Sequence, residues 1–362
     1  MARLGQLAAA GWRVPDGYAI TAGALAGWLS ASVRAELELL FSVPTDGSGS
    51  GAGGGDEGGH RGLVARAERA RELIESQVVP AGMADAVAGA HARLAERTGR
   101  GAGLLVAVRS SAVGEDGAAA SFAGQYETYL GVCGVEEVLR HVGRCLASGY
   151  SAHALAYRRR LGGGGGPRAA AGDLAVGVLE LVDARSAGVV FTLDPVTGDR
   201  ERLVVEANWG LGESVVSGQV TPDYWAVDRG SGRILERRTG AKRVRSVLAD
   251  GGAGPSGTVL APLPDGLAHA PCLSDDEVRY LCARAVAIEA AEGTPQDVEW
   301  AIAGDLEFPD SVYFLQHRPE TTWAAGSAPT AAPPAAEAAP APDGGFDPVR
   351  YALRNVFNVP GS

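Results

Sequence analysis

Two apolar segments near the C-terminal end of the chain have the pattern of paired β-strands, and they constrain the fold more than any other stretch. The segments cover residues 296–300 and 312–319, and the acidic stretch 304–310 between them has the length of a hairpin loop. Because strand side chains alternate between two faces, Asp297 and Glu299 share one face of the first strand. The segments therefore predict a β-hairpin with two carboxylates on one side.

The second strand adds an amide and a guanidinium to this hairpin. Gln316 and Arg318 are two residues apart and share a face, whereas His317 between them points to the other side. Carboxylate and amide oxygens suit Mg²⁺, and a planar guanidinium suits phosphate. The hairpin therefore favours a site for a magnesium-bound nucleoside triphosphate, and the competing interpretation is a solvated polar face.

Three further motifs carry groups that suit a nucleotide. One apolar strand ends in Arg109 and two serines, so that a guanidinium and two hydroxyls converge. The stretch 121–128 contains Gly124, where the main chain can approach a phosphate closely. Glu206 follows an apolar run. Its carboxylate could contact a ribose or lie near Mg²⁺, and the alternative is that it serves as the N-cap of the next element. Each motif taken alone also fits an ordinary ion pair, turn or cap.

The pattern along the whole chain favours an α+β fold, because short apolar runs predict strands and longer runs with helical spacing predict helices. A Gly/Ser-rich stretch at 44–62 and a Gly-rich stretch at 161–172 predict flexible surface loops. An Ala/Pro-rich linker and tail occupy residues 324–362. The predicted helices cover residues 22–41, 63–79, 82–98, 135–160 and 275–292, and the remaining predicted strands cover residues 104–111, 174–182, 187–193, 202–207 and 223–228.

Charge and composition narrow the classes of function. The 362 residues carry a formal net charge of -11, which argues against a general nucleic-acid binder, although local arginines still permit an anionic small ligand. No run of about 18 apolar residues is present, so we expect no membrane span. The four cysteines lack metal-finger spacing and predict buried free thiols in a reducing cytoplasm.

Five motifs occur in an order that resembles a known family, the N-terminal nucleotide-binding domain of phosphoenolpyruvate synthase, pyruvate phosphate dikinase and rifampicin phosphotransferase. The resemblance covers residues 2–323. It implies an ATP-grasp-like fold in which ATP and Mg²⁺ lie in a cleft between two subdomains, residues 1–185 and residues 186–323. The motifs that carry the resemblance are residues 108–112, 121–128, 188–195, 206–223 and 296–319.

The resemblance also implies roles for individual residues. Arg109 and Arg318 are expected to hold the transferring phosphates and so to act in catalysis. Glu299 and Gln316 are expected to bind Mg²⁺, and Asp297 to help order the site. Further contacts with the nucleotide are implied for Gly124, Thr128 and Glu206.

Two departures from the family pattern concern the nucleotide. The family has a phosphate-contacting lysine just before the stretch that aligns with residues 2–5. Lys242 is far from that place in the sequence, and Arg3 is near it but off register. The family glutamine on the strand at 176–182 aligns with Leu179, and its loss removes an amide contact worth on the order of 1 kcal/mol.

In this family a swivelling domain carries a histidine that accepts phosphate from ATP. The Thr-Cys-x-x-His-Gly type of acceptor turn is absent from the sequence, so we expect the histidine carrier to be a separate partner protein. The first functional hypothesis is an ATP-dependent phosphotransferase component that phosphorylates this carrier. The alternatives are a degenerate, non-catalytic nucleotide-binding or regulatory subunit, and a stand-alone ATP-grasp ligase.

Overall fold

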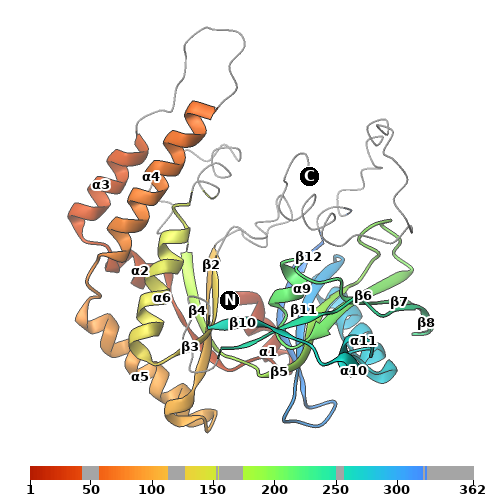
Figure 1. Cartoon of the computed structure of the whole chain (residues 1–362). Coiled ribbons are helices and arrows are strands. Elements are labelled where there is room, and N and C mark those ends of the chain that lie inside the picture. The colour runs from red at the N-terminus through yellow and green to blue at the C-terminus, as the bar shows by residue number, and fades with distance from the viewer. Residues whose placement is uncertain are drawn as a thin grey trace, which may run out of the picture.

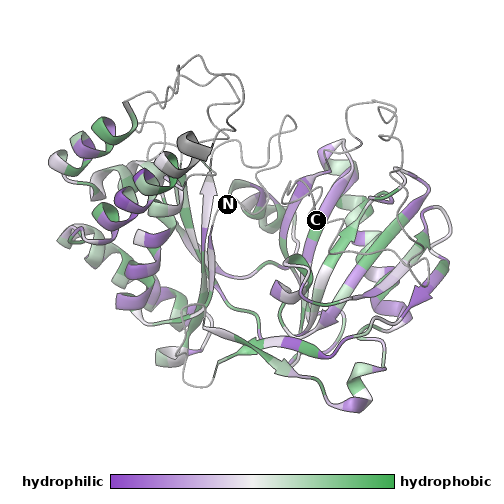
Figure 2. Cartoon of the chain, turned by 45° about the horizontal axis from the view of Figure 1, so that its top comes forward, coloured by the Kyte–Doolittle hydropathy of each residue, from purple (hydrophilic) through white to green (hydrophobic). Residues whose placement is uncertain are grey.

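The computed structural model describes residues 1–42, 57–112, 127–151, 174–249 and 257–320, together with Ala154 and Trp323. Its main features are two antiparallel sheets, each with helices on its outer side (Figure 1). Figure 2 shows hydrophobic residues along the strands of both sheets and mixed hydrophilic and hydrophobic faces on the covering helices. The predicted mixture of helices and sheets is therefore confirmed.

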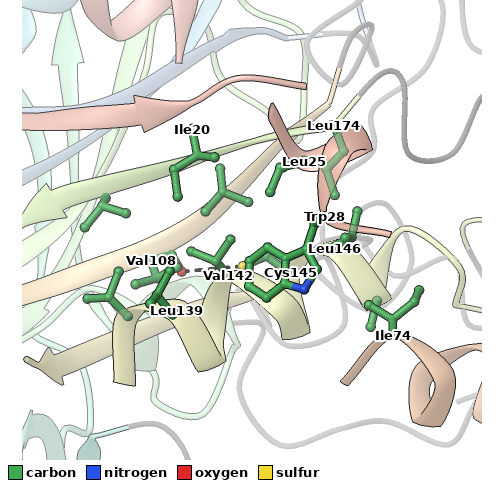
Figure 3. Packing of buried hydrophobic residues seen from close by; sticks show 14 of the residues in the cluster. Ile20, Leu25, Trp28, Ile74, Val108, Leu139, Val142, Cys145, Leu146 and Leu174 are labelled. Atoms are coloured by element: carbon green, nitrogen blue, oxygen red, sulfur yellow. Dashed lines mark hydrogen bonds between the residues drawn. The ribbon is translucent and has the colours of Figure 1, made fainter. Parts of the chain in front are cut away.

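The first sheet has four strands in the order β1-β4-β2-β3, and all its pairings are antiparallel. Its outer face forms one apolar core with the helices, in which Val108 of β2, Trp28 of α2, and Val142 and Cys145 of α6 are buried (Figure 3). The other face of the sheet is left for polar residues such as Arg109. The strands are β1 (Gly17–Ile20), β2 (Leu105–Ala112), β3 (Thr128–Cys133) and β4 (Leu174–Glu180).

The predicted helix 22–41 is wrong in one respect, because the structure contains two helices there, α2 (Ala22–Trp28) and α3 (Ala31–Ser42). Leu29 between them is extended, with φ -73° and ψ 127°. The Ser30 hydroxyl accepts a hydrogen bond from the Val33 main chain at 3.3 Å, which satisfies a first-turn N–H of the second helix. A serine inside an Ala/Leu-rich run therefore starts a new helix.

Three more helices cover the first sheet, and two of them differ from the predicted bounds. Residues 57–62 were expected in a loop but are helical, because α4 begins at Glu57; the rest of that loop and all of 161–172 lie outside the described residues. The predicted helix 135–160 ends at Ser148, where Gly149 follows. The Gly-rich stretches 44–62 and 161–172 therefore predicted the start of one helix and the end of another at the wrong residues. The helices are α4 (Glu57–Glu75), α5 (Ala81–Arg97) and α6 (Val135–Ser148), with the short 3₁₀ helix η1 (Gly101–Gly103).

The second sheet has six strands in the order β12-β11-β5-β6-β7-β8, again with antiparallel pairings. Its outer face packs on α11 through buried residues that include Val190, Trp225, Val298 and Leu281. A two-stranded ribbon of β9 (Val244–Leu248) and β10 (Thr258–Pro262) stands beside it. The six strands are β5 (Ala184–Phe191), β6 (Arg202–Trp209), β7 (Asp223–Asp228), β8 (Ile234–Arg238), β11 (Gln296–Ala303) and β12 (Val312–Pro319), and the helices are α9 (Glu213–Val216), α10 (Asp265–Ala268) and α11 (Asp275–Glu292).

Helix α11 begins with the predicted capping box. The Ser274 hydroxyl accepts from the Glu277 main chain at 3.3 Å, and the Ser274 main chain donates to the Glu277 carboxylate at 2.8 Å. Two first-turn donors are thereby satisfied, and this fixes the start of the helix. The prediction is confirmed.

The N-terminal helix α1 (Ala2–Ala9) lies between the two sheets in both views (Figures 1 and 2). Its buried Leu4 and Leu7 belong to the core of the second sheet. The Phe314 main chain of β12 donates to the Arg13 carbonyl at 2.9 Å, which ties the segment after α1 to the edge of that sheet. The first residues of the chain therefore pack on β12, although the strand that follows them, β1, belongs to the first sheet.

All four cysteines are free thiols, and Cys145, Cys272 and Cys282 are buried, whereas Cys133 is exposed. Burial raises the pKa of the Cys282 thiol to about 12, so this group stays protonated. The expectation of free thiols is confirmed, with one of them on the surface. Among the described residues, no helix has the length and apolar character needed to cross a membrane.

Candidate nucleotide-binding site

The hairpin of β11 and β12 forms as predicted. Asp297 lies opposite Arg318 and Glu299 lies opposite Gln316, so these four side chains project from one face. A bulge follows Glu299, and the register shifts there. The predicted gathering of two carboxylates, an amide and a guanidinium on one face is confirmed.

His317 points to the opposite side, as expected from strand alternation. It is 1% exposed, and its Nδ1 lies 3.0 Å from Oε1 of Gln296. Val298 faces it across the hairpin and belongs to the apolar core under α11. His317 is therefore a hydrogen-bonded core residue and contributes no side chain to the polar face.

Arg318 forms a two-pronged ion pair with Asp297. The Arg318 Nε and Nη2 atoms lie 2.8 and 2.7 Å from the same carboxylate oxygen, Oδ2. The other oxygen, Asp297 Oδ1, is buried and has no hydrogen-bond partner in the described part of the chain. Because an unsatisfied buried carboxylate oxygen is costly, this atom suits a donor, a water or a cation brought by a ligand.

Arg109 connects the two sheets at this site. Its Nη2 donates to Oε1 of Gln316, and its Nη1 donates to the Leu315 carbonyl at 3.3 Å. Arg109 comes from β2 of the first sheet, whereas both acceptors come from β12 of the second. The structure thus brings together a guanidinium and a hairpin amide that are 207 positions apart in the sequence.

A pocket lies where α1, β2 and β12 meet. It contains the Arg109 contact with Gln316, and Ser110 and Ser111 follow Arg109 along its wall. Thr128 of β3 is the cross-strand neighbour of Arg109 and is exposed. Gly124, the other residue of the expected phosphate loop, lies outside the described residues. The full set of lining residues is Met1, Arg3, Leu4, Arg109, Ser110, Ser111, Leu315, Gln316 and His317.

Glu206 lies on the same face of the second sheet as the hairpin carboxylates, because Val189 pairs with both Glu206 and Glu299. It is only 9% exposed. Burial raises the pKa of the Glu206 carboxyl to about 7; the charge of Arg238 lowers it and the charge of Asp297 raises it. A glutamate half-ionised near neutral pH on this face is typical of functional sites.

The alternative role of Glu206 as an N-cap is wrong. The residue lies inside β6, which continues to Trp209, and the N-cap of the next helix, α9, is Gly212. The predicted strand 202–207 was two residues too short. The strand continues past the apolar run, because the polar Asn208 is also buried in it. Its amide donates hydrogen bonds to the Ser214 hydroxyl and the Val244 carbonyl, each at 3.1 Å.

Lys242 is buried and plays a structural role. Its ammonium donates to the Asp223 carboxylate and, at 2.7 Å, to the Ala270 carbonyl. It is 0% exposed and does not line the pocket. This agrees with the expectation that it does not replace the family lysine.

Leu179 also has a structural role. It is 5% exposed and packs in the same apolar cluster as Leu4 and Leu7 of α1. The leucine therefore contributes apolar packing between the first sheet and α1.

The donor set fits Mg²⁺ only if a ligand supplies further oxygens. In the described ranges, no group of three or more His, Cys, Asp or Glu side chains is arranged to hold a metal ion. Glu299 and Gln316 offer one carboxylate and one amide oxygen on neighbouring strands. Mg²⁺ is commonly held by one or two protein oxygens together with phosphates and water. The site is thus chemically suited to magnesium that arrives with a nucleotide.

Comparison with known proteins places these features in a family. Residues 1–338 match the family described as pyruvate phosphate dikinase, AMP/ATP-binding domain. A probable phosphoenolpyruvate synthase of Methanothermobacter thermautotrophicus is 37% identical over 324 residues, which are 89% of this chain and 43% of that protein. A rifampicin phosphotransferase of a Streptomyces species is 38% identical over 322 residues, 89% of this chain and 34% of that protein.

A prodigiosin synthesizing transferase of Serratia marcescens is 40% identical over 255 residues, 70% of this chain and 26% of that protein. The chain therefore spans less than half the length of these curated relatives. The match nevertheless includes both sheets and the β11–β12 hairpin. The chain belongs to the pyruvate phosphate dikinase AMP/ATP-binding domain family.

Proposed function

We propose that this chain binds Mg²⁺ and ATP in an ATP-grasp-like arrangement, between subdomains at residues 1–185 and 186–323. In this proposal it transfers phosphate to a histidine on a separate swivelling-domain protein in the cytoplasm. The observation that carries the proposal is the contact of Arg109 with Gln316, because it joins the two sheets at a polar pocket. The ATP-binding family and the names of two relatives, a probable phosphoenolpyruvate synthase and a rifampicin phosphotransferase, support it.

Residues of the pocket and of the adjoining hairpin face carry out different parts of phosphoryl transfer, which depends on positioning and charge neutralisation. Arg109 and Arg318 hold the transferring phosphates, and Asp297 orients Arg318 through the ion pair at 2.7–2.8 Å. Glu299 and Gln316 hold Mg²⁺, which would neutralise phosphate charge. Rotation of Arg109 away from Gln316 would free both groups, one for phosphate and the other for the metal.

Three more residues complete the proposed nucleotide contacts. Gly124 and Thr128 line the phosphate loop, and Glu206 lies near the nucleoside. The buried Glu206 carboxyl and the exposed Thr128 hydroxyl can both bond a nucleotide hydroxyl or phosphate. Substitution of each by a residue without the polar group should weaken nucleotide binding.

The direct test is phosphate transfer from ATP labelled in its β- and γ-phosphates. The chain is mixed with Mg²⁺, labelled ATP and the isolated swivelling domain of a related phosphoenolpyruvate synthase. We expect acid-labile, base-stable label on a histidine of the added domain, together with release of ADP or AMP. If ATP binds tightly but no histidine is labelled, phosphate transfer is refuted, and the chain is a protein that only binds the nucleotide.

The second candidate is a non-catalytic nucleotide-binding or regulatory subunit. The packing of Leu179 under α1 favours it, because an apolar residue has replaced a polar contact at the expected adenine or ribose position. This candidate predicts ATP binding with no Mg²⁺-dependent release of ADP or AMP when the swivelling domain is present. The same labelling experiment therefore separates the two candidates.

A further inference from the structure

The ribbon of β9 and β10 is attached to the second sheet at the turn that follows β6. The Leu211 main chain of this turn donates a hydrogen bond to the Ser246 carbonyl of β9 at 2.9 Å. One carboxylate oxygen of Glu213 accepts hydrogen bonds from the hydroxyls of Ser246 in β9, at 3.2 Å, and Thr258 in β10, at 2.8 Å. Both strands of the ribbon are therefore held by the second sheet and move with it.

The ribbon also touches β3 of the first sheet, where two glycines meet; Figure 1 shows the ribbon between β3 and the second sheet. A Cβ atom on Gly257 would lie 2.3 Å from the Leu130 carbonyl oxygen. A Cβ atom on Gly131 would lie 2.8 Å from the Gly257 carbonyl oxygen. Both glycines have a positive φ, 71° at Gly131 and 63° at Gly257. This main-chain contact therefore requires a residue without a side chain at both positions.

The strand that the ribbon touches is the neighbour of the strand that carries Arg109. Arg109 of β2 pairs with Thr128 of β3, three residues before Gly131. Arg109 also donates to Gln316 of the second sheet. The strands β2 and β3 are therefore connected to the second sheet at two places, at the pocket and at the ribbon. Because hydrogen-bonded strands move together, the sheets separate at the pocket only when β3 also moves away from Gly257.

Apolar side chains beside the glycine contact favour the closed position of the ribbon. Leu130 of β3 and Leu248 of β9 are partly buried and pack against a cluster that contains Ala187 of β5 and Ala301 of β11. Burial of this apolar surface stabilises the contact. The glycines themselves contribute little apolar surface, so the contact can open while each sheet keeps its own core.

We propose that the β9–β10 ribbon is a strap that keeps the two sheets together, and that separation of Gly257 from β3 lets the nucleotide enter and leave the pocket. The proposal rests on the proposed function, because it assumes that the nucleotide binds in that pocket. The strap contacts β3 both with and without the nucleotide. A weaker strap therefore speeds association and dissociation by similar factors and changes the affinity little, since affinity depends only on the difference between the free and bound states.

Rapid-mixing kinetics with Mg²⁺ and a fluorescent, non-hydrolysable ATP analogue test the strap. Gly257→Ala places a methyl group against the Leu130 carbonyl and so pushes the ribbon away from β3. We expect its association and dissociation rate constants to rise about tenfold each, with a dissociation constant within about threefold of the native value. The matched control is Gly232→Ala, because Gly232 has φ 68° and no atom within 4 Å of the position that a Cβ would occupy. This control carries the same backbone strain and should show native kinetics.

Thr258→Val loosens the attachment of the strap to the second sheet without adding a clash. The substitution removes the 2.8 Å hydrogen bond to Glu213 and keeps the shape of the side chain. Both rate constants should rise again, by a smaller factor than in Gly257→Ala. This variant decides the question if thermal melts show that Gly257→Ala does not fold.

A distance measurement tests the strap without any nucleotide. Spin labels are attached through the substitutions Glu96→Cys, on α5, and Glu201→Cys, just before β6, at exposed positions beside the first and the second sheet. The further substitution Cys133→Ser removes the exposed native thiol. Double electron–electron resonance should give one separation for the native strap and for Gly232→Ala, and an additional, longer separation for Gly257→Ala.

Two results would overturn the inference. The first is native kinetics and a single native separation in both Gly257→Ala and Thr258→Val while the native chain binds the analogue, which leaves the proposed function intact. The second is a loss of affinity caused by faster dissociation alone, because the ribbon would then contact the bound nucleotide and not control its passage. Failure of the native chain to bind the analogue would refute the proposed function, and the passage of nucleotide past the strap with it. The spin-label separation would then still decide whether the ribbon holds the sheets together.

Discussion

Replacement of the buried Glu206 by glutamine should stabilise the protein at alkaline pH. The carboxyl is 9% exposed, and its pKa is raised to about 7 in the folded chain from its ordinary value of 4.5. The cause is burial, which disfavours the charged form more than the opposing charge of Arg238 favours it. Glutamine has nearly the same shape and cannot ionise, so the variant removes the cost of the buried charge.

The size of the effect follows from the two pKa values. Between pH 4.5 and about 7 the folded state holds more protons at Glu206 than the unfolded state, so the free energy of unfolding falls as pH rises. The destabilisation caused by the buried charge of Glu206 is absent below pH 4.5 and complete above about pH 7. A difference between 4.5 and about 7, at 1.36 kcal/mol per unit, corresponds to about 3 kcal/mol.

Urea unfolding followed by tryptophan fluorescence at pH 5.5 and pH 8 measures this effect. We expect the stability advantage of Glu206→Gln over the native chain to be about 3 kcal/mol at pH 8 and clearly smaller at pH 5.5. Glu201→Gln, at an exposed position just before β6, is the control and should behave like the native chain at both pH values. An advantage that is the same at both pH values, or a variant that is less stable at pH 8, would refute the reasoning.

The other predictions concern the proposed site and its support. Glu299→Ala should abolish Mg²⁺-dependent release of ADP or AMP without changing the circular dichroism spectrum, and retained turnover would exclude a metal role. Arg318→Ala should lower the rate of phosphate transfer by about a thousandfold or more, as measured by labelling of the carrier, and a native rate would contradict its role. Lys242→Met should lower the free energy of unfolding measured in urea by about 3–5 kcal/mol, because Asp223 stays buried with main-chain donors but without its counter-ion; a loss below about 1 kcal/mol would show that Asp223 tolerates the loss of the cation.

Strand alternation made the hairpin face predictable from the sequence. Asp297, Glu299, Gln316 and Arg318 share that face, and His317 points away, because successive side chains of a pleated strand leave on opposite sides. This rule depends on the order of residues within one strand and needs no knowledge of the rest of the fold. The capping box of α11 was predictable for the same reason, since Ser274 and Glu277 are three residues apart.

Helix boundaries were less predictable, because local composition competes with packing. The break at Leu29 depends on one serine hydroxyl that caps the next helix, inside a run with uniform helical propensity. Helix α4 starts at Glu57, within a stretch whose glycines predicted a loop. Helix α4 packs against α3 and α6, and tertiary packing of this kind can override the low helix propensity of glycine.

The sequence by itself determined which polar groups each segment presents: a hairpin with four polar side chains on one face, and a strand whose last residues include Arg109 and two serines. Only the tertiary structure decided that Arg109 reaches Gln316 and the Leu315 carbonyl, and that α1 places Arg3 at the same pocket. The physical reason is that side-chain direction is set by neighbouring residues along one strand. Contacts between distant segments depend instead on how buried apolar faces, such as Leu4 and Leu7 against the second sheet, pack together.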